Sequence, residues 1–332
     1  MRERTPRIAT DTSGLLLGQL APGDRIGPFR VQGRLPSRGH GLVYVASHAK
    51  LQYRVMIRIL PASYGSTSSI AMELIRAAQI LESLDHPGIP RVIVCDTLPD
   101  GRSWVASQLI AGTKLGTVIS EWPITAEDVV TVIHDVAAIL ETAHRVGLVH
   151  TNLVPSAIVM PDVEMASPLM VGDWGQARTE DSMSPGPFRL TSRGRPYLAP
   201  EQLQHETITT ATDIYALGVI AYQAVTGELP MTPRAEAQDH IPAVVMTLIE
   251  QMLATDPARR PTSTQVRESA AQISTTLARI ASGPEPTLAT RTLADTISSE
   301  RFTQVSGEIN ATSTTVVARI RLVRRAVPAL AR

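Results

Sequence analysis

The chain has 332 residues, of which 43% are hydrophobic, so it can fill the core of one large or two ordinary globular domains. Its 31 lysine and arginine residues balance 31 aspartate and glutamate residues, and this neutrality argues against nucleic acid as a partner. The single cysteine, Cys95, excludes an internal disulfide, and neither a signal-peptide core nor a bilayer-spanning apolar run is present, so we expect a cytoplasmic protein with a buried thiol.

The first part of the chain is predicted to be rich in β-strands. Residues 1–25 are polar and without hydrophobic period, which predicts a flexible lead-in. Between residues 26 and 110, short runs rich in valine and isoleucine alternate with glycine, proline or polar turns, as in an antiparallel sheet. One helix is expected at 68–84. The expected strands lie at 28–35, 41–49, 53–60, 90–98 and 103–110.

From Thr125 onward a helical period dominates. Thr125 and Asp128 have the spacing of a capping box, and a long apolar face follows them. Further helices are expected at 213–227, where the sequence is apolar all round, and at 241–254. A strand-rich part followed by a helix-rich part predicts an α+β protein with separate lobes.

The order of several short motifs resembles that of bacterial serine/threonine protein kinases. The motifs are GLVYVA, VMIRIL, LDHPGIPRVI, GLVHTNLVPSAIV, GDWG, YLAPEQL, TDIYALGVIAYQAVTGELP and DPARRP. Each is a weak signal alone, but their order and spacing identify a kinase-like domain over 26–283. The resemblance implies an α+β, two-lobed fold with a small β-rich lobe at 26–110 and a larger helical lobe at 111–283. A linker rich in serine and threonine and a basic tail follow at 284–332.

The loop that covers the nucleotide phosphates in this family matches residues 36–43. Its glycines let the backbone approach the phosphates closely, and of the three only Gly41 is present here. Pro36 lacks an amide donor, and Arg38 adds bulk where the backbone should approach ATP. Either Arg38 and His40 hold a phosphate, or the segment is an ordinary strand turn.

The family's nucleotide-binding lysine matches Arg58, which keeps the charge but is larger and planar. The glutamate that pairs with this lysine matches Ala77. Glu73 lies one turn earlier on the expected helix, where it either reaches Arg58 or stays solvated at the surface. The usual ion pair of the family is therefore not encoded in its usual form.

The catalytic loop of the family matches residues 150–157. His150, Leu153 and Pro155, which shape the loop, are kept. The family's arginine, catalytic aspartate, lysine and metal-binding asparagine are replaced here by Thr151, Asn152, Val154 and Ala157. An amide cannot accept a proton from a substrate hydroxyl as a carboxylate does, and valine and alanine bind neither phosphate nor metal.

Charged residues survive at other positions of the family. Asp173 matches the metal-binding aspartate and is the one candidate metal ligand; it either binds magnesium weakly or orders its loop. Glu201 and Arg260 match a structural ion pair of the larger lobe, and Asp213 matches the residue that anchors the catalytic loop.

Residues that shape the fold are kept, whereas residues that carry the chemistry are replaced. This pattern predicts a pseudokinase: a catalytically impaired, kinase-like scaffold or regulator in bacterial signalling. The alternative is a weakly active or divergent ATP-dependent serine/threonine kinase. No cofactor is required, although weak binding of ATP and magnesium through Gly41, Arg58 and Asp173 stays open. The expected partners are proteins, either an active serine/threonine kinase or a phosphopeptide-binding protein.

The segment from Ala318 to Arg332 contains five arginines and no acidic residue. One interpretation is a short helix docked on the helical lobe, or a plain solvated tail. The other is a membrane-proximal segment of a longer protein, because basic residues gather on the cytoplasmic side of membranes. The threonine-rich linker before it offers sites for phosphorylation by another kinase.

Overall fold

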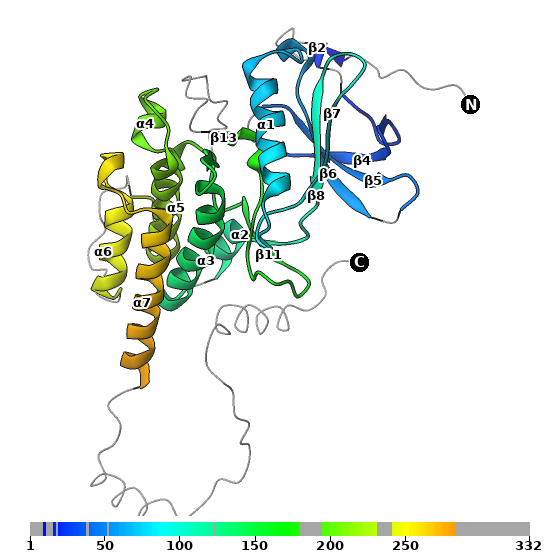
Figure 1. Ribbon diagram of the computed structural model, residues 1–332. Helices are drawn as coiled ribbons and strands as arrows, with labels where there is room; N and C mark the ends of the chain where they lie inside the picture. The colour runs from blue at the N-terminus through cyan, green and yellow to red at the C-terminus, as the bar shows by residue number, and fades with distance from the viewer. Residues whose placement is uncertain are drawn as a thin grey trace, which may run out of the picture.

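The computed structural model describes residues 9–10, 16–17, 19–37, 40–51, 53–122, 124–179, 194–230 and 241–282. This part of the chain forms two lobes, a sheet that carries one helix and a bundle of helices (Figure 1). Most of the expected lead-in, and all of the expected linker and tail at 284–332, lie outside the described residues.

The small lobe contains an antiparallel sheet with the strand order β3-β4-β5-β6-β8-β7. Valine, isoleucine and aromatic side chains of these strands form one core, in which the rings of Phe29 and Trp104 meet edge to face at 6.3 Å. The strands are β3 (Arg25–Ile26), β4 (Phe29–Leu35), β5 (Leu42–His48), β6 (Arg54–Ile59), β7 (Val92–Thr97) and β8 (Ser103–Gln108). All five expected strands are confirmed, and each observed strand is one to three residues shorter than expected. Two short strands, β1 (Ala9–Thr10) and β2 (Leu16–Leu17), pair separately.

Helix α1 (Ser69–Ser83) confirms the helix expected within the small lobe. It begins after Ser68, whose hydroxyl oxygen accepts a hydrogen bond from the backbone N–H of Ala71 at 3.2 Å. Its buried residues recur at intervals of three or four and so form one face, which packs on β7 and β8. Ala77 is on this face.

The large lobe consists mainly of helices (Figure 1). They are α2 (Leu115–Glu121), α3 (Ala126–His144), α4 (Pro200–Leu203), α5 (Thr210–Thr226), α6 (Ala243–Met252) and α7 (Ser263–Ser282). The capping box predicted at the start of α3 is confirmed, because Thr125 and Asp128 exchange side-chain and backbone hydrogen bonds of 3.2 and 3.3 Å. Helix α5 is buried along most of its length, as its apolar sequence predicts, and packs against α3 and α6.

Short strands join the lobes and carry the loops of the candidate site. Strands β9 (Gly112–Lys114), β11 (Ile158–Pro161) and β12 (Met170–Val171) form one small sheet, and β10 (Leu148–Val149) pairs with β13 (Arg178–Thr179). Between β12 and β13 lies a 3-10 turn, η2 (Trp174–Gln176). The loop after β10 and the turn after β12 lie where the lobes meet, because β10 contacts α3 and α5 of the large lobe and η2 contacts α1 of the small lobe.

The expectation of a buried thiol needs a correction. Cys95 lies on the edge strand β7 and is only half-buried, because β7 has a neighbour on one side alone. Burial nevertheless raises the pKa of the Cys95 thiol, so that it stays protonated near neutral pH. A structural role therefore still fits this residue better than a nucleophilic one.

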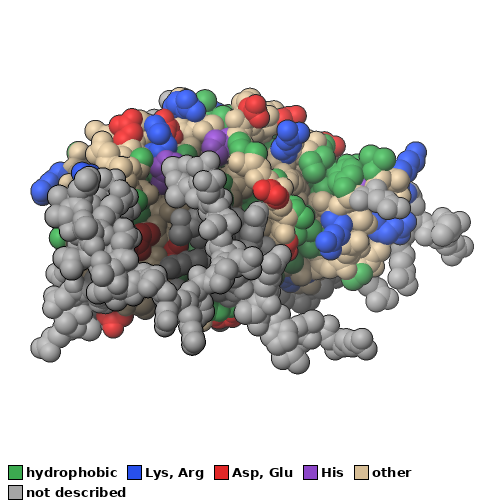
Figure 2. Space-filling view, turned by 90° about the horizontal axis from the view of Figure 1, so that it is seen from below, with side chains coloured by type: hydrophobic (Ala, Val, Ile, Leu, Met, Phe, Trp, Pro, Cys, Tyr) green, Lys and Arg blue, Asp and Glu red, His purple; other side chains and the backbone are tan. Residues whose placement is uncertain are grey.

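Charges of both signs share the molecular surface. Figure 2 shows acidic and basic side chains interspersed on the face seen from below, in keeping with the zero net charge of the chain. In the part of the chain that the structure describes, no helix combines the length and the apolar character needed to span a bilayer.

Candidate functional site

The loop after β10 is anchored by Asp213, which lies in the first turn of α5. This carboxylate is 1% exposed and accepts hydrogen bonds from the backbone N–H groups of His150 and Thr151, at 2.7 and 2.8 Å. Thr151 has a φ of 64°, a left-handed conformation that a β-branched residue rarely adopts. The two hydrogen bonds hold this conformation, and the predicted anchoring role of Asp213 is confirmed.

His150 is committed to the packing of the same loop. Its Nε2 lies 2.9 Å from the carbonyl oxygen of Gly172, which can only accept a hydrogen bond, so Nε2 carries the proton. Its Nδ1 then accepts a hydrogen bond from the backbone N–H of Asn152 at 3.3 Å, and its ring packs against Trp174 at 4.6 Å. Both ring nitrogens are therefore occupied within the protein, and His150 is not a substitute base for Asn152.

The other replaced positions of the loop are buried. Asn152 is 6% exposed, and Val154 and Ala157 are each 3% exposed. The backbone N–H of Ala157 donates to the carbonyl oxygen of Val154 at 2.9 Å, which closes the turn that follows the loop. The loop thus keeps a compact shape, and its two apolar positions present no ligand for a phosphate or a cation.

Arg58 lies on β6, at the centre of the sheet, and only 4% of it is exposed. Its guanidinium forms an ion pair with the carboxylate of Asp173. It also donates to the carbonyl oxygen of His40 at 2.9 Å and to the hydroxyl of Ser37 at 3.4 Å. A Cβ atom at Gly175 would collide with Arg58 Nε, so the arginine lies directly on the backbone of the turn at η2. The Arg58 side chain therefore links both lobes across the cleft.

Asp173 precedes η2 and has a φ of 64°, a left-handed conformation that aspartate tolerates better than most residues. Its side chain is 21% exposed, and its carboxylate faces Arg58. Within the described ranges, no three side chains of His, Cys, Asp or Glu lie close enough together to hold a metal ion. The predicted metal candidate is thus one carboxylate that is already neutralised by an arginine.

The turn between β4 and β5 keeps one glycine for a steric reason. Gly41 has a φ of 93°, and a Cβ atom there would collide with the carbonyl oxygen of Ile59. His40 is 5% exposed, and its Nδ1 lies 2.9 Å from the hydroxyl of Tyr64. This contact within the small lobe favours the strand-turn interpretation over phosphate binding by His40. Arg38 lies outside the described residues.

Neither expectation for Glu73 is correct. Its side chain is 18% exposed, and its carboxylate lies 3.4 Å from Nε of Arg178, on β13. Glu73 misses Arg58 because its position on α1 faces β13, whereas the position that faces the core is taken by the buried Ala77. Arg178 is a site residue that the sequence analysis missed. The sequence offered one signal, an arginine five residues after Asp173, but not the contact of its strand β13 with α1.

The Glu73 carboxyl gives a prediction about pH. Burial raises its pKa above the ordinary value of 4.5, although Arg178 lowers it in part. A carboxyl with a raised pKa in the folded state contributes stability that is complete below about pH 4.5 and is lost as the pH rises through the folded pKa. Chemical denaturation should therefore show that Glu73→Gln raises the free energy of unfolding, relative to the original chain, most strongly near neutral pH. This advantage should shrink as the pH falls.

The exposed Glu82, on the same helix, gives the matched control. Because this side chain is exposed, the Glu82→Gln variant should change the free energy of unfolding at neutral pH by no more than about 0.5 kcal/mol. A difference for Glu73→Gln that grows towards acid pH would contradict the assignment of burial as the dominant effect on Glu73.

The predicted structural ion pair of the large lobe is confirmed. Arg260 donates two hydrogen bonds to the carboxylate of Glu201, at 2.7 and 2.8 Å, and both residues are buried. Thr212 donates a further hydrogen bond to Glu201 at 2.8 Å. This network holds α4 and α5 to the segment before α7.

Comparisons with known proteins show similarity to protein kinases. The protein kinase domain family matches residues 32–270. The chain is similar to the serine/threonine-protein kinase pkn3 of Myxococcus xanthus, with 28% identity over 71% of this chain and 48% of the relative. It is similar to the serine/threonine-protein kinase PknJ of Mycobacterium tuberculosis, with 27% identity over 74% of this chain and 45% of the relative. It thus spans less than half the length of these two relatives.

A solved structure shows the same fold. A double mutant of the PknI kinase domain of Mycobacterium tuberculosis superimposes with a TM-score of 0.60 at 22% sequence identity, over 77% of this chain and 98% of that domain. The family match covers well over half of the 332 residues, in the order of elements described above. The chain therefore belongs to the protein kinase domain family.

Proposed function

We propose that this member of the family is a pseudokinase, which acts as an interaction or regulatory scaffold in bacterial signalling and does not transfer phosphate. The observation that carries the proposal is the ion pair between Arg58 and Asp173. A kinase uses the cation at the first position for nucleotide phosphates and the carboxylate at the second for magnesium. Here the two charges neutralise each other in an ion pair.

The surroundings of this ion pair make it costly to separate the Arg58 and Asp173 side chains. Arg58 is buried, donates to two further oxygen atoms and lies against Gly175. Mg-ATP would have to separate Arg58 from Asp173 and leave the arginine without its partner, or bind without either residue. Every 1.4 kcal/mol or so of this cost weakens binding about tenfold.

The catalytic loop adds a second obstacle, which concerns the chemical step. Asn152 has an amide where the family has a carboxylate, and His150 uses both ring nitrogens within the fold. Val154 and Ala157 offer neither a cation for the transferred phosphate nor an oxygen ligand for magnesium. A bound nucleotide would therefore meet no group suited to activate a hydroxyl nucleophile.

The alternative proposal is a weakly active ATP-dependent serine/threonine kinase. It is supported by the relatives, which are named serine/threonine-protein kinases, and by the retained Gly41 and Asp173. In that case Arg58 would have to turn away from Asp173 when nucleotide binds.

The remaining parts of the proposal concern partners and location. We propose protein partners, an active serine/threonine kinase or a phosphopeptide-binding protein, and no required cofactor. The balanced charge of the chain supports a protein partner over nucleic acid. A cytoplasmic site of action fits the single cysteine.

A phosphoryl-transfer assay tests the proposal. The full chain, incubated with labelled ATP and magnesium, should label neither itself nor generic protein substrates above the level of the Asp173→Ala variant. The Asn152→Asp variant should also stay at that level, because it restores the base but leaves Arg58 on Asp173 and Ala157 without a metal-binding oxygen. Labelling by the original chain that disappears in Asp173→Ala would favour the weakly active kinase.

A further inference from the structure

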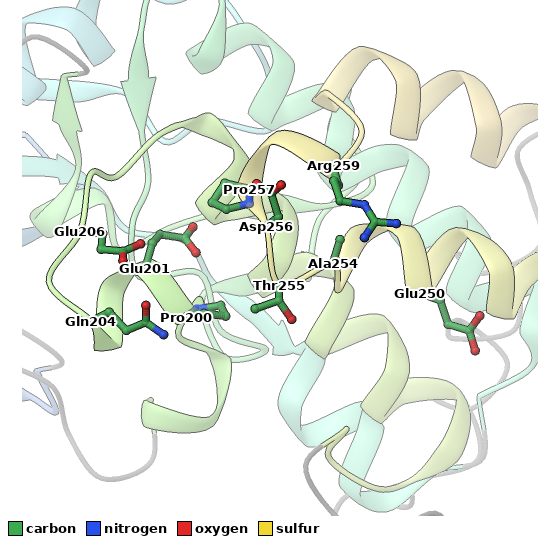
Figure 3. A pocket seen from close by; sticks show the side chains of 10 residues that line it. All are labelled: Pro200, Glu201, Gln204, Glu206, Glu250, Ala254, Thr255, Asp256, Pro257 and Arg259. Carbon is green, nitrogen blue, oxygen red and sulfur yellow. The ribbon is translucent and has the colours of Figure 1, made fainter.

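A groove of about 610 Å³ lies on the large lobe, away from the cleft between the lobes (Figure 3). It is formed by α4 and the residues that follow it, the end of α6, and the turn η5 (Pro257–Arg259). Its lining includes the apolar residues Pro200, Ala254 and Pro257. None of the functions considered above uses this groove.

The groove is held in shape by the buried network beneath it. Arg260 pairs with Glu201 in the wall of the groove and also donates to the carbonyl oxygens of Ala254 and Thr255, at 2.8 and 3.1 Å. The backbone N–H of Glu206 donates to the carbonyl oxygen of Glu201 at 2.8 Å. These hydrogen bonds connect the two sides of the groove, so its shape exists before anything binds.

The rim of the groove carries unbalanced negative charge. Glu206, Glu250 and Asp256 line it, are exposed, and form no ion pair with any residue that the structure describes. Figure 3 shows Glu206 towards one end and Glu250 towards the other. Arg259 is the one cation among the lining residues, so three carboxylates against one guanidinium leave two negative charges. Glu201 is left out of this sum because Arg260 neutralises it.

We propose that this groove binds the C-terminal segment of the same chain, residues 318–332. That segment contains five arginines and no acidic residue, with valine, leucine and isoleucine between the arginines. The arginines complement the carboxylates of the rim, and the apolar side chains match the apolar part of the lining. An extended segment of 15 residues is long enough to contact both ends of the groove.

The connecting chain has a suitable length. Residue Arg260 and η5 lie just before α7, so the groove is at the first end of that helix, while the connection to the tail begins at its last residue, Ser282. The 20 residues of α7 span about 30 Å. The 35 residues at 283–317 are enough to cover this distance, since a chain can extend by about 3.3 Å per residue. Binding of the tail to the groove would therefore be an intramolecular event, favoured by effective concentration.

Disulfide trapping in the full chain tests this proposal. In a Cys95→Ala background, one cysteine is placed on the groove (Gln204→Cys) and one in the tail (Ala326→Cys). Matched controls combine the same tail cysteine with Val163→Cys, an exposed position on the loop between β11 and β12. At low protein concentration and low salt, the Gln204 pair should form an intramolecular disulfide at least about tenfold faster than the Val163 pair.

Charge reversal shows whether the rim causes the difference. Arg321→Glu with Arg324→Glu should remove the advantage of the Gln204 pair, and adding Glu206→Arg with Glu250→Arg should restore it. Equal trapping at Gln204 and Val163 would overturn the proposal. A crosslinked dimer instead of a crosslinked monomer would assign the groove to a second copy and would also overturn it. So would failure of the charge swap to restore trapping, or equal trapping accompanied by tail-dependent co-sedimentation with anionic vesicles. Each outcome is independent of whether the cleft binds nucleotide.

Discussion

Replacing Arg260 by alanine should lower the free energy of unfolding by about 3–5 kcal/mol, because it leaves the buried carboxylate of Glu201 without a counter-charge. Glu201 is 2% exposed and receives both of its strongest hydrogen bonds from Arg260. The variant also frees the carbonyl oxygens of Ala254 and Thr255 and removes the guanidinium that packs on the ring of Tyr215 at 4.9 Å. Each of these losses lowers the free energy of unfolding.

The neighbouring Arg259 provides a matched control for this experiment. It is exposed and forms no ion pair with the described residues, so Arg259→Ala should change stability by no more than about 0.5 kcal/mol. Urea denaturation of both variants, at one pH and one protein concentration, gives the comparison. Similar values for the two variants would show that the Arg260 network contributes little to the fold.

Replacing Asp213 by alanine should destabilise the chain by about 2–6 kcal/mol. The buried N–H groups of His150 and Thr151 both lose their acceptor, and each unsatisfied buried group costs about 1–3 kcal/mol. Thr151 also loses the contact that holds its left-handed backbone. His144, whose Nε2 lies 3.0 Å from the Asp213 carboxylate, loses a partner as well.

Asp85→Ala serves as the control for Asp213→Ala, because Asp85 is exposed in the turn after α1. Its replacement should stay within about 0.5 kcal/mol of the original chain. Thermal unfolding gives the same ranking by an independent route. A chain that tolerates Asp213→Ala as well as Asp85→Ala would contradict the assignment of Asp213 as the anchor of the loop.

Features that depend on local sequence were predictable. The strands of the small lobe follow from short runs of β-branched residues, and the start of α3 follows from Thr125 and Asp128. The ion pair of Glu201 with Arg260 was predictable only through the resemblance to kinases, because 59 residues separate its members. No pattern in the sequence alone connects two such residues.

Features that depend on how elements pack were not predictable. The contact of Arg58 with Asp173 joins residues 115 positions apart, and it needs both the side-chain conformation of the arginine and the left-handed backbone of the aspartate. The pairing of Glu73 with Arg178 depends on how α1 is rotated and placed beside β13. A helical period shows which face of α1 is apolar, but not which strand the polar face meets.

We propose that the side chain of Arg58 and its partner Asp173 leave no functional site for Mg-ATP. Thermal unfolding of the full chain with increasing Mg-ATP shows whether such a site exists, with magnesium alone as the control. A ligand at a hundredfold excess over its Kd adds about 2.7 kcal/mol of stability, which corresponds to about 5–10 °C in a domain of this size. Because Arg58 occupies Asp173, we expect millimolar Mg-ATP to raise the Tm by less than about 1 °C. A rise of several degrees that is lost in the Asp173→Ala variant would contradict it.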